Sequence, residues 1–207
     1  MTNETEETSG LFGRVWSFIS DEPSLAISLG YLLLIGIGML FSYQYYANWG
    51  IDVFQFAGFE DFLLAPFKDM LVLFFVPVSV LISYLAIRFS KKLDRKYPRL
   101  SKYWNFGITA ESKNYNQFMN FHLFAGILLY LHTSSSIFSA YREYRVRKHP
   151  ENYRVNVQLE DGSFQPYLLL GLTENFVLVL SEKERQAIAI PTEGGKVKGI
   201  FFSAGSR

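Results

Sequence analysis

The 207-residue chain contains no cysteine and only three histidines. The lack of cysteine excludes disulfide bonds, thiolate catalysis and cysteine-ligated zinc. Patterns for serine hydrolysis are also missing, since no Gly-x-Ser-x-Gly turn surrounds the serines near His132 and no acidic residue lies on the same stretch to orient that histidine. We therefore expect no catalytic residue, no metal site and no cofactor, and we expect the protein not to be an enzyme.

Lysine, arginine, aspartate and glutamate are all missing from three long stretches, which are residues 23–51, 70–87 and 114–141. A helix needs about 20 apolar residues to cross the core of a bilayer, and a chain in lipid must pair its own backbone polar groups, which a helix does. The sequence therefore predicts an integral membrane protein with three transmembrane helices, at residues 25–46, 70–88 and 117–140.

The charges that remain are segregated along the chain, although the net charge is only +1 and does not indicate a nucleic-acid partner. Residues 1–22 hold five acidic residues against Arg14, and we expect a polar tail with a possible interfacial helix at residues 11–19. The loop at residues 88–113 holds eight basic residues, and next to a membrane helix such residues bind anionic lipid headgroups. The predicted lipid contacts are Lys91, Lys92, Arg95, Lys96, Arg99 and Lys102.

The segment at residues 50–69 is rich in phenylalanine but also carries five charged residues. Five charges make a further full span very costly. We therefore predict an interfacial helix or a re-entrant turn here, which leads the chain into the second transmembrane helix.

The third apolar stretch is unusually polar on one side. His132, Ser135, Ser136 and Ser139 recur at steps of three and four residues and would share one face of a helix. Such a face should point at protein or water rather than at lipid. We interpret it as a face for helix packing or, alternatively, as the lining of a pore.

The hydrophobic period changes to two after residue 153, where Val155, Val157 and Leu159 alternate with polar residues. Asp161 and Gly162 then form a strong hairpin signal. Further strands are predicted at residues 164–170, 176–180, 187–190 and 197–202. Five short strands predict a small all-β domain at residues 151–207, a barrel of the SH3, Sm-like or OB type. So small a core is marginal alone, so we expect it to lean on the membrane, on a partner or on copies of itself.

The orientation follows from counting basic residues, because short loops rich in lysine and arginine stay cytoplasmic. With three spans, the N-terminal tail and the loop at 88–113 share one side and hold nine basic residues, against five that follow the third helix up to Arg154. We therefore predict a cytoplasmic N-terminus and a β-domain on the opposite side.

Two segments resemble a loosely defined set of bacterial inner-membrane proteins of unknown function. The resemblance is carried by GIDVFQFA and DFLLAPFKD, between residues 50 and 69, and by LLLGLTENFVLVL and AIAIPTE near the C-terminus. It implies a multi-span protein of the bacterial inner membrane with a terminal β-domain, and it transfers no activity. The β-domain is also similar to the Sm-like domain of small-conductance mechanosensitive channels, but the glycine- and alanine-rich pore helix of those channels is missing here.

These features predict a non-enzymatic accessory or anchoring subunit, held in the bilayer by residues 23–150, whose β-domain binds a protein partner. The alternative is a homo-oligomeric channel or membrane effector, in which the third helix lines a pore and the β-domains form a ring. The two hypotheses differ in whether the protein associates with itself or with another chain.

Overall fold

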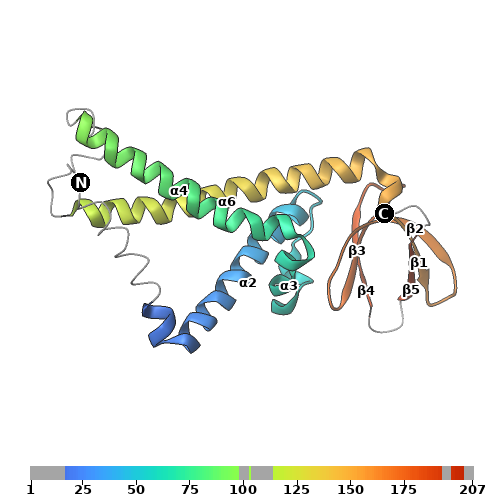
Figure 1. Cartoon of the computed structure of the whole chain (residues 1–207). Coiled ribbons are helices and arrows are strands. Elements are labelled where there is room, and N and C mark those ends of the chain that lie inside the picture. Colours follow the sequence, from blue (N-terminus) through green and yellow to red (C-terminus); the bar gives the residue numbers. More distant parts are fainter. Residues whose placement is uncertain (1–16, 98–102, 104–113, 193–196, 203–207) are drawn as a thin grey trace.

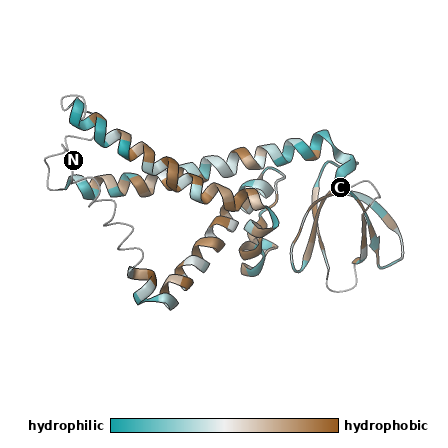
Figure 2. Ribbon diagram, in the orientation of Figure 1, coloured by the Kyte–Doolittle hydropathy of each residue, from teal (hydrophilic) through white to brown (hydrophobic). Residues whose placement is uncertain are grey.

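Three long helices and one antiparallel sheet make up the computed structural model, which describes residues 17–97, 103, 114–192 and 197–202 (Figure 1). The long helices are α2 (Pro23–Ala47), α4 (Met70–Lys96) and α6 (Tyr115–Lys148), and all three are long and apolar enough to cross a membrane. Apolar residues dominate the middle of this bundle and polar ones its ends (Figure 2). Large apolar side chains also cover its outside, with Leu32, Phe74 and Leu129 each more than 60% exposed.

Two of the helices run further than the apolar stretches predicted. Helix α4 continues to Lys96 and α6 continues to Lys148, so the predicted basic loop is helical up to residue 96. Hydropathy falls where charges begin, but lysine and arginine are good helix formers and are favoured near a helix C-terminus by the helix dipole. At about 1.5 Å per residue, α6 is about 50 Å long and extends well beyond a hydrocarbon core of about 30 Å.

The predicted interfacial segment folds as a short 3-10 helix, η1 (Val53–Gln55), followed by α3 (Phe59–Lys68). Gly38 of α2 lies directly against the backbone carbonyl of Phe62, so α3 packs on α2 with almost no space between the two backbones. Ile35, Val53 and Phe62 are buried together at this contact. Of the predicted interfacial helix at residues 11–19, only residues 17–19 are described; they belong to a helical turn at residues 17–21.

After a 3-10 turn, η2 (Pro150–Asn152), the chain forms five antiparallel strands in the order β4-β3-β2-β1-β5. They are β1 (Arg154–Leu159), β2 (Phe164–Leu172), β3 (Phe176–Leu180), β4 (Ala187–Pro191) and β5 (Val197–Phe202). The predicted C-terminal β-structure of five strands is thus confirmed.

The predicted barrel does not close among the described residues. Strands β4 and β5 form the two edges of the sheet and do not pair with each other in the described part of the chain. The sheet curls around a core of Val155, Val157, Val177, Val179 and Ile190. Its other face packs on the helices, so the apolar residues are buried without closure.

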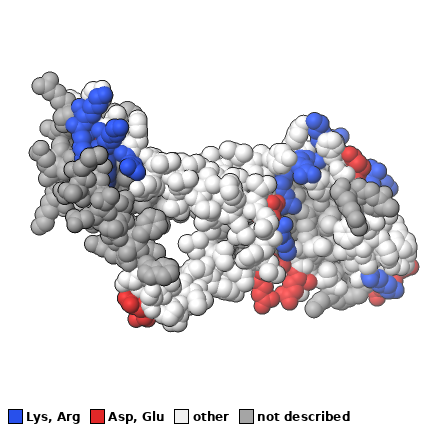
Figure 3. Space-filling model, viewed as in Figure 1, with Lys and Arg blue, Asp and Glu red and all other residues white. Residues whose placement is uncertain are grey.

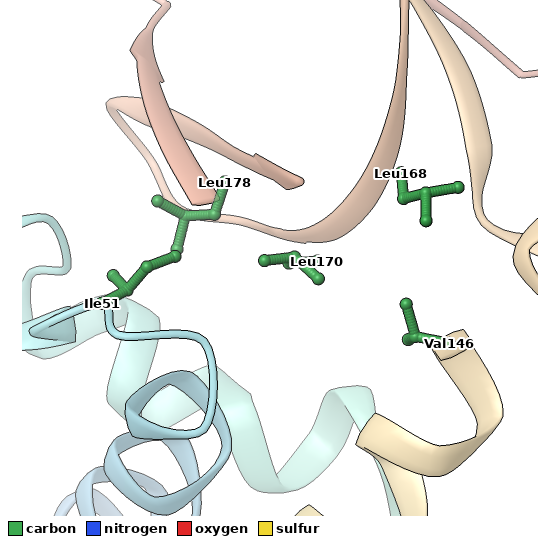
Figure 4. Packing of buried hydrophobic residues seen from close by; sticks show 5 residues of the cluster. All are labelled: Ile51, Val146, Leu168, Leu170 and Leu178. Atoms are coloured by element: carbon green, nitrogen blue, oxygen red, sulfur yellow. The ribbon is translucent and has the colours of Figure 1, made fainter. Parts of the chain in front are cut away.

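That second face joins the sheet to the helical bundle (Figure 4). Leu168, Leu170 and Leu178 of the sheet form one buried cluster with Val146 of α6 and Ile51, which follows α2. The β-domain is therefore not a tethered tail, and its core is completed by the end of the helical bundle, as the small size of the domain predicts.

Candidate functional site

The predicted polar face of α6 turns in part toward other helices of the same chain, whereas His132 on that face is exposed. Ser135 and Ser139 are almost completely buried, with exposed fractions of 0% and 1%. Their hydroxyl groups donate to carbonyl oxygens of their own helix, those of His132 at 2.8 Å and Ser135 at 2.7 Å. These hydroxyls are satisfied within the helix and leave its surface free to pack closely.

The other two residues of that face meet Gln44 of α2. The amide Nε2 of Gln44 lies 3.0 Å from Nδ1 of His132, and the Ser136 hydroxyl donates to Oε1 of Gln44 at 2.7 Å. Gln44 thus bridges the two helices. For Ser136 and His132 this contact fits the interpretation of the face as a helix-packing surface.

The sequence interpretation missed Gln44, although a signal for it was present. The signal is the amide side chain of Gln44, which lies inside the charge-free stretch at residues 23–51. Polar side chains in membrane helices often form hydrogen bonds to a neighbouring helix.

The three histidines do not come together. His122 bonds the carbonyl of Phe118 on its own helix at 2.9 Å, and His149 lies 3.1 Å from the Glu151 carboxylate beyond the end of α6. Within the described residues, no group of three or more histidine, aspartate and glutamate side chains is arranged to hold a metal ion.

The predicted lipid-binding residues that the structure describes lie at the end of the bundle farthest from the sheet (Figure 3). Lys91, Lys92, Arg95 and Lys96 occupy the last two turns of α4. Arg99 and Lys102 lie outside the described residues. The neighbouring Asp94 is buried and accepts a hydrogen bond from the Tyr115 hydroxyl at 2.7 Å, which ties α4 to the start of α6.

A cavity of about 140 Å³ lies where α2, α3, α4, α6 and β2 converge. We call it the junction cavity. Its charged lining residues are Asp61, Lys68, Asp69 and Arg142, and they stand beside the rings of Tyr45 and Tyr46. Because these groups come from three distant segments of the chain, sequence spacing gives no hint of the cavity.

An aromatic pair marks the part of the sheet that the helices leave uncovered. Phe164 of β2 and Phe201 of β5 lie with ring centroids 5.5 Å apart, and both are at least half exposed. Gly199 makes room for this contact, since a Cβ there would lie 3.1 Å from the Phe201 ring. Phe164 lies four residues before Leu168 on the same strand, so both residues belong to the same face of the sheet.

No protein-family model matches this chain, and no curated protein or solved structure is significantly similar to it. A proposal about function therefore rests on the residues of this chain. The resemblance to bacterial inner-membrane proteins stays a prediction.

Proposed function

We propose that this protein is a non-enzymatic subunit of the bacterial inner membrane, anchored by its three helices, which presents its β-sheet to a protein partner. The observation that carries the proposal is an open sheet fixed on the end of a bundle of three apolar helices, with an aromatic pair on its uncovered part.

The sheet is held in place by polar contacts as well as by its apolar cluster. The Thr173 hydroxyl donates to the Phe56 carbonyl at 3.0 Å, and the Lys68 ammonium donates to the Leu172 carbonyl at 3.3 Å. A surface that is fixed before binding loses little conformational freedom when a partner arrives. Such rigid seating suits a docking subunit.

The proposed partner surface has two parts. One is the uncovered part of the sheet that carries Phe164 and Phe201, and the other is the edge of β5. Phe164 and Phe201 are exposed aromatic residues of the kind that is enriched in the cores of protein interfaces. The edge of β5 offers backbone groups for an added strand, whereas β4 ends at Pro191, a residue that cannot donate to a neighbouring strand. The partner is therefore a protein with an extended apolar segment.

The replacement of both Phe164 and Phe201 by serine tests the docking surface. Full-length protein is purified in detergent, and the stoichiometry of co-purifying chains is measured with Lys198→Ala as a control on the same strand. We expect one partner chain in fixed ratio that the double variant loses and the control keeps. A particle made only of copies of this chain would instead support the homo-oligomeric channel, and equal recovery in both variants would overturn the docking surface.

The orientation is tested with single cysteines, because the natural chain has none. The bundle places the end of α4 and the sheet on opposite sides (Figure 1). A thiol at Lys198→Cys is expected to react with a reagent that cannot cross the inner membrane, while a thiol at Lys92→Cys stays protected until the membrane is opened. The reverse pattern would place the β-domain in the cytoplasm.

A further inference from the structure

The junction cavity lies at the point where two charge-free stretches end. Lys68 and Asp69 directly precede the stretch at residues 70–87, and Arg142 directly follows the stretch at residues 114–141. All three residues line the cavity. If the helices span a bilayer as proposed above, the cavity sits at the depth of the headgroups on the side of the sheet. Positive and negative side chains meet along this edge of the uncharged belt (Figure 3).

Arg142 brings unused hydrogen-bond donors to the cavity. Its guanidinium lies over the ring of Tyr45 at 4.4 Å and 5.9 Å from the ring of Phe138. Contacts with ring faces hold the position of the guanidinium and leave the N–H groups at its edge available. Among the described residues, no carboxylate forms an ion pair with Arg142 and no carbonyl accepts a hydrogen bond from it.

Lys68 adds a second cation with spare donors. It gives one hydrogen bond to the Leu172 carbonyl, and an ammonium group has three donors. The carboxylate of Asp61 accepts from the backbone amides of Gly58 and Glu174, and these bonds hold it against the backbone and compensate part of its charge. Asp69 is the remaining acidic residue of the lining. The groups left for a ligand are thus two cations and one carboxylate.

We infer that the junction cavity binds the phosphate group of a phospholipid, with Arg142 as its main ligand and Lys68 as the second. A planar guanidinium matches the geometry of phosphate oxygens. The volume of about 140 Å³ is roughly ten times what one water molecule requires. Asp69 adds a carboxylate to the same lining, and a carboxylate attracts an ammonium group, so we expect a zwitterionic headgroup, as in phosphatidylethanolamine.

The inference is tested on purified full-length protein in detergent by native mass spectrometry with added phosphatidylethanolamine. We expect one retained lipid in the natural protein, about a tenfold weaker retention in Arg142→Gln and in Lys68→Gln, and a partial recovery in Arg142→Lys. Arg147→Gln is the matched control, since Arg147 lies five residues further along α6, is exposed and pairs with Glu143. Unchanged retention in both Gln variants would overturn the site.

Two further probes identify the source of the phosphate. Diacylglycerol, which lacks phosphate, should not be retained, and equal retention of it would show that only the acyl chains bind. Inorganic phosphate should not displace the lipid at millimolar concentration, whereas displacement would assign the cavity to free phosphate. This test involves neither Phe164 nor Phe201, and it therefore fails or succeeds separately from partner binding. Resistance of the protein to carbonate extraction tests the membrane insertion on which both depend.

Discussion

The carboxylate of Asp61 in α3 accepts a hydrogen bond from the backbone amide of Glu174, 113 residues later in the chain, at 3.1 Å. The same carboxylate accepts from the amide of Gly58 at 3.1 Å and so caps the start of α3. One side chain thus connects the start of α3 to the turn between β2 and β3.

The replacement Asp61→Ala should therefore loosen the turn between β2 and β3. Hydrogen bonds to a charged group contribute about 1.5–3 kcal/mol each when they are buried, and Asp61 is half-buried, so we expect a loss of about 1–2 kcal/mol in unfolding free energy. Hydrogen exchange of the Glu174 amide should become faster, by the factor to which a loss of about 1–2 kcal/mol corresponds. Glu60→Ala, on an exposed position of the same helix, serves as the control, and equal exchange in both variants would show that Asp61 does not hold the sheet.

The contact between Tyr46 and Gly171 gives a second prediction. A Cβ on Gly171 would collide with the Tyr46 hydroxyl and approach its ring carbon to 3.1 Å. Overpacking of this kind costs about 1–3 kcal/mol, so Gly171→Ala should lower the midpoint of thermal unfolding. Tyr46→Phe removes the hydroxyl, and the double variant should recover most of the loss. Additive effects of the two changes would mean that the sheet does not sit on α2 at this point.

Local patterns allowed much of the fold to be predicted. The alternation at Val155 and Val157 placed β1, and the apolar stretch after Pro23 placed α2 within two residues at its start. The hydropathy pattern failed at the end of α6, because charged residues that end an apolar stretch do not end a helix.

The candidate sites could be predicted only in part. The sequence indicated that His132 and Ser136 lie on a contact face, but it did not indicate Gln44 as their partner. Contacts such as the one between the Asp61 carboxylate and the Glu174 amide leave no local signal, because a single aspartate resembles an ordinary surface charge and a backbone amide is present in almost every residue. The junction cavity depends on several such distant pairs, so only the folded chain reveals it.

Two glycines of α2 provide a matched pair for the packing of α3. A Cβ on Gly38 would strike the backbone carbonyl of Phe62, which cannot rotate away, whereas a Cβ on Gly36 meets nothing within 4 Å. We expect Gly38→Ala to destabilise the protein by about 2 kcal/mol or more, and Gly36→Ala to be neutral or stabilising by up to about 1 kcal/mol. Unfolding in detergent, followed by tryptophan fluorescence, measures both. A neutral Gly38→Ala would refute the close approach of α3.

The hairpin between β1 and β2 should respond to acid through Asp161. Oδ1 of Asp161 accepts hydrogen bonds from the Ser163 hydroxyl at 2.6 Å and from the Ser163 amide at 2.9 Å. These bonds, the one from the hydroxyl first, lower the pKa of Asp161 below its ordinary value. Gly162 supports the turn with a φ of +79°, a conformation that costs glycine little.

The direction of the pH effect follows from the lowered pKa. Asp161 stabilises the hairpin fully at pH values above the pKa that it has in the unfolded chain, and this stabilisation is lost as the pH falls through the lower pKa of the folded state. We expect the amide resonance of Ser163 to titrate with a midpoint below about 3.9, the ordinary value for aspartate. Asp161→Asn should abolish the titration and Glu160→Gln should leave it unchanged. A midpoint at or above the ordinary value would show that Ser163 does not bond the carboxylate in solution.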